Sequence, residues 1–298
     1  MTKAKTAATA GSISVLGLAV MNILAVATLR GLPAEAEYGL SSIFYYLFAA
    51  IFFLVPVSLV AAELATGWPE KGGVFRWVGE AFKTRWAFLA VFMLFLQTAV
   101  YFPTALTFGA VSLAYVDTDT TVAEKISGNE IFVLAIVLAI YWLATIVGLR
   151  GTAAFATVSK WAGYIGVIAP AVILMVMCFL YVLFGNKPQI KIGWDELIPD
   201  FTNFGTIVLA ASIFLFYAGM EMNAVHVKEV KNPSRNYPMG VLIAAAGTVI
   251  IFVLGTLAIA FVVPQSDINL TQALLTAYYD MFDWAHMGWA APVGAVML

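Results

Sequence analysis

The chain has 298 residues, of which 62% are apolar or aromatic and 11% are charged, whereas a soluble domain carries roughly 25% charged residues. This composition, with its repeated long apolar runs, places the chain in a bilayer and excludes a soluble enzyme, a fibrous protein and a disordered tail. The net charge of -2 and the lack of a basic cluster do not favour binding to nucleic acid.

Apolar runs long enough to cross about 30 Å of hydrocarbon predict seven membrane spans. The spans cover residues 13–32, 40–64, 86–115, 131–149, 161–184, 204–225 and 239–263. An eighth apolar run begins near Trp284 and is interrupted at Leu298, so we expect the chain to stop within a span. We predict one all-α polytopic membrane domain over residues 1–298, because no loop is long enough for a separate soluble domain.

The first predicted span contains a tract that departs from a regular apolar helix. It runs from Asn22 to Thr28 and combines a polar side chain with small residues. Such a tract is typical of a broken helix that exposes backbone groups near the membrane midplane, although small residues also serve helix packing. Arg30 follows at the outer end of the span, where it either extends to the interface or attracts an anionic substrate, and it is a candidate for coupling or gating.

The second predicted span ends in an acidic residue and an amphipathic loop. Glu63 is a candidate for gating or coupling because ionisable side chains are costly at membrane depth, and pairing with a basic loop residue is the alternative. Aromatic and charged residues are interspersed in the loop from Thr66 to Arg85, as they are in an interfacial helix. We expect its aromatic side chains at the cytoplasmic surface.

The sixth predicted span contains Tyr217, Ala218 and Gly219, followed by Glu221. The small residues allow the helix to relax, and the carboxylate is a functional candidate by its depth. This tract lies five helices after the tract in the first span. Broken helices at matching positions of two inverted repeats indicate a transporter site, where free N–H groups bind a carboxylate and free carbonyls bind an ammonium group. An amino acid zwitterion is the natural ligand for such a site.

Basic residues are distributed unequally between the two sides of the predicted spans. One side has eleven Lys and Arg residues and the other has four. Because cytoplasmic loops carry the excess, the N-terminus is predicted to lie in the cytoplasm.

Two sequence blocks carry a resemblance to a known family. The first is residues 61–66 (AAELAT) with 69–77 (PEKGGVFRW), and the second is residues 217–221 (YAGME) with His226 and 229–238 (EVKNPSRNYP). The chain resembles the amino acid/polyamine/organocation transporter superfamily from about Gly11 to Leu270, and most closely its bacterial glutamate/gamma-aminobutyrate antiporter branch. The resemblance implies an inverted five-helix repeat transporter fold with alternating access. The first repeat would cover residues 13–184, approximately. The part of the second repeat that is present would cover residues 204–298, approximately, and would be incomplete.

The resemblance also implies roles for individual residues. The substrate carboxylate would bind backbone N–H groups in the first break, at Ile23, Ala25, Val26, Ala27 and Thr28. The amino group would bind carbonyls of Tyr217, Ala218 and Gly219. We also expect Asn22, the polar residue of the first tract, to bind the substrate. Glu221 would couple transport, and Tyr101 would either flank the site or serve aromatic packing. Many superfamily members have Gly-Ser-Gly where this chain has Val26-Ala27-Thr28, which leaves the substrate open.

From this resemblance we predict an inner-membrane exchanger that imports an acidic amino acid such as glutamate and exports its decarboxylation product. Exchange or proton symport of a neutral or cationic amino acid or a polyamine is an alternative, and a non-transporting sensor or partner subunit is another. An enzyme is not expected, because no catalytic motif is recognisable. The expected partners are the substrate, its counter-substrate and the lipid bilayer, without a cofactor or a metal, and a homodimer is compatible with the sequence.

Overall fold

The structure is a computed structural model that describes all residues except 1–12, 69–71, 117–119, 151–157, 159 and 200–210. The described residues form helices joined by turns, with one isolated parallel β-bridge between Ile13 and Val230. The prediction of an all-α chain is confirmed, whereas the inverted repeat stays a prediction.

Five helical stretches are long and apolar enough to cross a membrane, and they coincide with five predicted spans. They are Ser41–Gly67, Thr84–Ala114, Glu130–Leu149, Lys160–Leu183 and Pro233–Val262. The first predicted span is a pair of helical stretches, Val15–Val26 and Leu29–Ala36, bent by 41°. In the predicted sixth span, residues 204–210 lie outside the described residues. The predicted eighth span corresponds to the shorter apolar helix Gly288–Met297.

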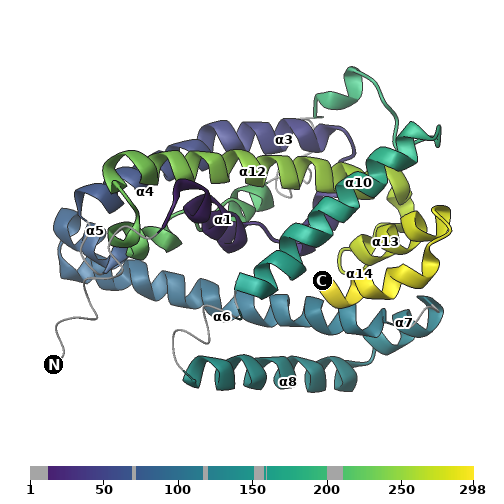
Figure 1. The fold of residues 1–298 in the computed structure, drawn as a ribbon, viewed down its shortest axis with the longest axis horizontal. Helices are drawn as coiled ribbons and strands as arrows, with labels where there is room; N and C mark the ends of the chain where they lie inside the picture. Colours follow the sequence, from purple (N-terminus) through teal and green to yellow (C-terminus); the bar gives the residue numbers. More distant parts are fainter. Residues whose placement is uncertain (1–12, 69–71, 117–119, 151–157, 159, 200–210) are drawn as a thin grey trace. The chain divides into compact units, whose positions relative to one another are not determined.

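Figure 1 labels the longer helices, and η denotes 3-10 and π segments. The first half of the chain contains α1 (Val15–Val26), η1 (Leu29–Gly31), α2 (Leu32–Ala36), α3 (Ser41–Ala49), η2 (Ala50–Leu54), α4 (Val55–Gly67), α5 (Gly73–Phe82), α6 (Thr84–Ala114), α7 (Thr120–Ser127) and α8 (Glu130–Leu149). The second half contains η3 (Tyr164–Ile168), α10 (Ala169–Leu183), η4 (Asp195–Leu197), η5 (Met222–Glu229), α12 (Pro233–Val262), η6 (Gln265–Asp267), α13 (Ala273–Trp284), η7 (Gly288–Ala290) and α14 (Ala291–Met297).

Two spans contain a π segment that ends two residues before a proline. The π segment η2 precedes Pro56 in the first turn of α4, and the π segment η3 precedes Pro170 in the first turn of α10. Proline lacks an N–H group, and its ring crowds the carbonyl four residues earlier. The wider π turn relieves that crowding, so both spans continue through the proline.

The amphipathic loop after the second span contains α5. The side chains of Phe75 and Phe82 are exposed on this helix, and Arg76 forms an ion pair with Glu80 one turn later, at 2.7 Å. The loop therefore forms the helix that its pattern predicted, and its location at the membrane surface stays a prediction.

The contacts divide the chain into two compact units, and three of the boundaries between them fall within helices α3, α6 and α12. Unit 1 comprises Met1–Ala27, Tyr45–Thr98 and Asp200–Ile251. Unit 2 comprises Thr28–Phe44, Ala99–Pro199 and Phe252–Leu298.

In unit 1, glycines bring α12 close to α1 (Figure 1). A methyl group on Gly240 would lie 2.9 Å from Cδ2 of Leu18, and one on Gly247 would lie 2.8 Å from Cδ1 of Ile23. Both apolar side chains would have to move to admit it. Small residues allow membrane helices to approach closely in this way, so the glycines set the packing of α1.

Candidate functional site

The first span is broken at Ala27 and Thr28. The N–H group of Ala27 donates to the carbonyl of Ile23 at 2.7 Å and closes the last turn of α1. Ala27 and Thr28 are both extended, with ψ angles of 115° and 127°, and η1 begins at Leu29. A helix end leaves its last carbonyls and the next helix leaves its first N–H groups without helical partners. The break that the tract predicted is therefore present.

The sixth span is broken at Gly219. Residues 211–216 are helical, 217–221 form turns, and η5 follows. The φ angle of Gly219 is +116°, a conformation that residues with a side chain rarely adopt. The N–H group of Ala218 donates to the carbonyl of Leu215, and that of Met222 donates to the carbonyl of Gly219. This break is therefore fixed by one glycine.

Unit 1 brings the end of α1 and the break at Gly219 together. A methyl group on Gly219 would lie 3.4 Å from Cγ2 of Val26 and 3.8 Å from the carbonyl oxygen of Ala25. The fully buried Asn22 donates to the carbonyl of Leu18 at 3.0 Å, and its Oδ1 accepts from Nδ2 of Asn223 at 3.3 Å. Two tracts about 200 residues apart in sequence thus form one polar contact region.

Two predicted site residues pack away from that region. The ring of Tyr217 is fully buried, and its hydroxyl donates to the carbonyl of Tyr46 at 3.4 Å. The side chain of Ile23 lies against Gly247 of α12. Tyr217 therefore anchors the break against α3, and Ile23 anchors α1 against α12.

Most of the backbone N–H groups predicted to bind the substrate carboxylate belong to the helix α1. Those of Ile23, Ala25 and Val26 lie within α1, and that of Ala27 is bonded to Ile23. In this conformation, Thr28 is the first of these residues whose N–H group is not part of the α1 helix.

The two acidic candidates of unit 1 lie in different surroundings. Glu221 is half-buried at the N-terminus of η5, where its carbonyl accepts from the N–H group of Ala224. Glu63 is exposed on α4, and Thr66 donates to the carbonyls of Ala62 and Glu63. Glu221 therefore lies next to the break at Gly219, whereas Glu63 belongs to the helix end that precedes the amphipathic loop.

In unit 2, Arg30 is held by α6. Its guanidinium carbon lies 4.6 Å from the ring centroid of Tyr101, and Nη1 donates to Oγ1 of Thr104 at 2.5 Å. Thr104 in turn donates to the carbonyl of Tyr101 at 2.8 Å. The buried Nε of Arg30 makes no hydrogen bond within the described residues. The structure thus pairs two candidates that the sequence analysis treated separately.

Two residues of these clusters were missed in the sequence analysis. Thr104 lies on the face of α6 one turn after Tyr101, and Asn223 lies four residues after Gly219. The sequence signal that could have identified them is a polar side chain within an apolar segment. Glu35, also missed, is fully buried in α2.

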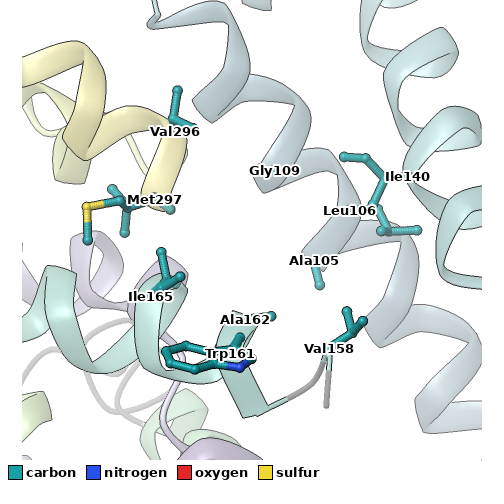
Figure 2. A pocket seen from close by; sticks show the side chains of 12 residues that line it. Ala105, Leu106, Gly109, Ile140, Val158, Trp161, Ala162, Ile165, Val296 and Met297 are labelled. Atoms are coloured by element: carbon teal, nitrogen blue, oxygen red, sulfur yellow. The ribbon is translucent and has the colours of Figure 1, made fainter. Parts of the chain in front are cut away.

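Unit 2 also contains a hollow of about 630 Å³ that none of the predicted site residues lines (Figure 2). Its walls come from α6, α8, the segment around η3 and α14, and Figure 2 shows Trp161 and Ile165 facing Val296 and Met297 across part of it. The lining is almost entirely apolar. It therefore does not suit a zwitterion, and we place the candidate site at the helix breaks.

Comparison with known proteins gives a consistent result. A family model described as amino acid permease matches residues 6–298. An uncharacterized transporter of Legionella pneumophila is 35% identical over 96% of this chain and 60% of its own length. A glutamate/gamma-aminobutyrate antiporter of Lactococcus lactis is 30% identical over 96% of this chain and 57% of its own length. An inner membrane transporter of Escherichia coli is 26% identical over 78% of this chain and 48% of its own length. The chain thus spans between 48% and 60% of the length of these relatives.

Proposed function

Because the chain belongs to the amino acid permease family, we propose that it takes part in secondary transport of amino acids across the bacterial inner membrane, with its N-terminus in the cytoplasm. The specific proposal is antiport of an acidic amino acid such as glutamate against its decarboxylation product. It is supported by the similarity to the Lactococcus lactis antiporter, whose name states this pair. Family membership points to a transporter rather than an enzyme.

The observation that carries the proposal is the meeting of the end of α1 with the break at Gly219. Carbonyl groups at the end of α1 and at Tyr217, Ala218 and Gly219 suit the amino group of the substrate. The N–H groups that follow the first break, starting at Thr28, suit its carboxylate. Glu221, next to the second break, is proposed to couple transport.

Arg30 supplies a cation for an acidic substrate. Tyr101 and Thr104 fix its guanidinium group, and its buried Nε–H has no acceptor within the described residues. A guanidinium group binds a carboxylate through two parallel hydrogen bonds, so this group is suited to a carboxylate. We propose that Arg30 favours glutamate over neutral amino acids.

A second candidate is transport of a cationic amino acid or a polyamine, because the half-buried Glu221 next to the break would attract a cation. Counterflow separates the two. Liposomes containing the full-length protein are loaded with glutamate, gamma-aminobutyrate or putrescine, and uptake of labelled glutamate and labelled putrescine is measured. Glutamate uptake that depends on internal glutamate or gamma-aminobutyrate supports the proposal. Uptake of putrescine alone supports the second candidate, and ligand binding without any flux supports a sensor or partner subunit.

A further inference from the structure

A groove between α5 and α6 in unit 1 has no role in the proposed transport site. Its volume is about 460 Å³, and its surface is entirely apolar. The two helices pack closely beside it, since a methyl group on Gly79 would lie 3.5 Å from Cβ of Ala87 (Figure 1). The residues that line the groove are Val78, Phe82, Trp86, Leu89, Ala90 and Met93. Such a surface suits a hydrocarbon chain better than a polar solute.

A single residue, Lys83, connects the two helices that form the groove. Helix α5 ends at Phe82, and α6 begins at Thr84. The φ angle of Lys83 is +78°, in a region that favours glycine because the Cβ atom of other residues crowds the backbone. Strain of this kind is found where a residue serves a function. A lysine in a position suited to glycine therefore indicates a function for its side chain.

Two cationic side chains lie at this turn. Lys83 and Arg85 are both exposed, and neither forms an ion pair with any residue that the structure describes. In sequence they lie between Phe82 and Trp86, which line the groove. With the N-terminus in the cytoplasm, as proposed above, the loop after the second span is cytoplasmic as well, and the cytoplasmic leaflet contains anionic lipids. The apolar groove and the two cations together match the two parts of such a lipid.

We propose that this groove binds an anionic phospholipid of the cytoplasmic leaflet. One acyl chain lies in the groove against Phe82 and Trp86, and the phosphate group lies at Lys83 and Arg85. Charge complementarity selects this occupant, because a lipid without net charge would leave the two cations uncompensated. The site is separate from the helix breaks, and lipid binding to it does not depend on transport.

The test measures lipid binding to the full-length protein in detergent by native mass spectrometry. The protein is titrated with phosphatidylglycerol or with phosphatidylcholine that has the same acyl chains, and the Kd of the first bound lipid is determined. We expect phosphatidylglycerol to bind the wild type about tenfold or more tightly than phosphatidylcholine, because each basic residue near an anionic lipid contributes about fivefold. In the double variant Lys83→Gln, Arg85→Gln, the two Kd values should become nearly equal.

The matched control is the double variant Lys187→Gln, Lys191→Gln, which removes two exposed cations elsewhere in the chain. It should keep the wild-type preference for phosphatidylglycerol. A further variant, Ala90→Trp, fills the groove with a large side chain. It should weaken phosphatidylglycerol binding by about fivefold or more, because the acyl chain loses its apolar contacts.

Lys83→Gly separates the charge of this residue from the shape of the turn. Glycine adopts a φ angle of +78° without strain, so the midpoint of thermal unfolding should not fall, whereas the preference for phosphatidylglycerol should decrease. A lysine that serves only the turn would leave the lipid preference unchanged in this variant, which would contradict the proposal.

Three other results would overturn the lipid site. The first is an equal Kd for the two lipids in the wild type. The second is a preference for phosphatidylglycerol that persists in the Lys83, Arg85 double variant or is lost equally in the control. The third is a dimer of the wild type that Ala90→Trp dissociates, which would assign the groove to a second copy of the chain. None of these measurements requires flux, so failure of the lipid site would leave the proposed transport function standing.

Discussion

The two helix breaks differ in what holds them open. In the sixth span, Gly219 has a φ angle of +116°, so the backbone itself requires a glycine at this position. In the first span, Ala27 and Thr28 adopt extended angles that any residue adopts, and no glycine is present from Asn22 to Arg30. Side-chain contacts on either side of this break hold it instead, from Asn22 to Asn223 and from Arg30 to Tyr101 and Thr104. One break is local and the other depends on partners far away in the sequence.

The largest effect is expected from Gly219→Ala. The side chain would strain the backbone by about 1–3 kcal/mol and crowd Val26. We expect the midpoint of thermal unfolding in detergent to fall and glutamate exchange to drop by about tenfold or more. Gly148→Ala on α8 is the control, because its methyl group meets open space. An unchanged exchange rate in Gly219→Ala would show that this break does not depend on glycine.

The next effect is expected from Asn22→Ala, which removes the acceptor of the Asn223 amide. Leaving a buried polar group without its partner costs about 1–3 kcal/mol, and the partly buried Asn223 amide is expected at the lower end of that range. Thermal unfolding of Asn22→Ala, Asn223→Ala and the double variant gives the coupling between the two side chains. We expect the double variant to be little less stable than Asn22→Ala alone. Fully additive losses would contradict a direct contact.

A smaller effect is expected from Arg30→Ala and Thr104→Val, measured as the KM for glutamate. Loss of the cation should raise KM by about tenfold, and loss of the single hydrogen bond to Thr104 should raise it by about twofold to tenfold. Thr98→Val is the matched control, because Thr98 lies on the same helix and bonds only to the carbonyl of Leu94 among the described residues. A KM for glutamate that is unaffected in Arg30→Ala would remove this residue from substrate recognition.

The smallest effect is expected from Ala27→Gly. If side-chain contacts hold the first break, added backbone freedom should cost at most about 0.5–1 kcal/mol. Exchange should then stay within about twofold of the wild type. A loss as large as that of Gly219→Ala would show that both breaks depend on local backbone conformation, and the contrast between them would disappear.

The sequence was sufficient to locate both breaks, but it did not predict the side-chain contacts around them. Gly219 and its small neighbour mark the second break locally, so the tract alone was sufficient. The tract from Asn22 to Thr28 marked the first break only through its composition. The contacts of Asn22 with Asn223 and of Arg30 with Thr104 could not be predicted, because each joins residues of separate helices. Glu35 was overlooked because it follows the apolar run rather than interrupting it.

By itself, the sequence determined that the chain is helical and membrane-spanning, and which of its segments are long enough to cross, because these properties depend on the length and apolar character of continuous runs. Tertiary structure decided which side chains face one another. It buried Glu35, paired Asn22 with Asn223 and placed Arg30 on Tyr101. The physical reason is that burial and pairing are set by contacts between distant segments, whereas hydropathy is a property of each segment alone.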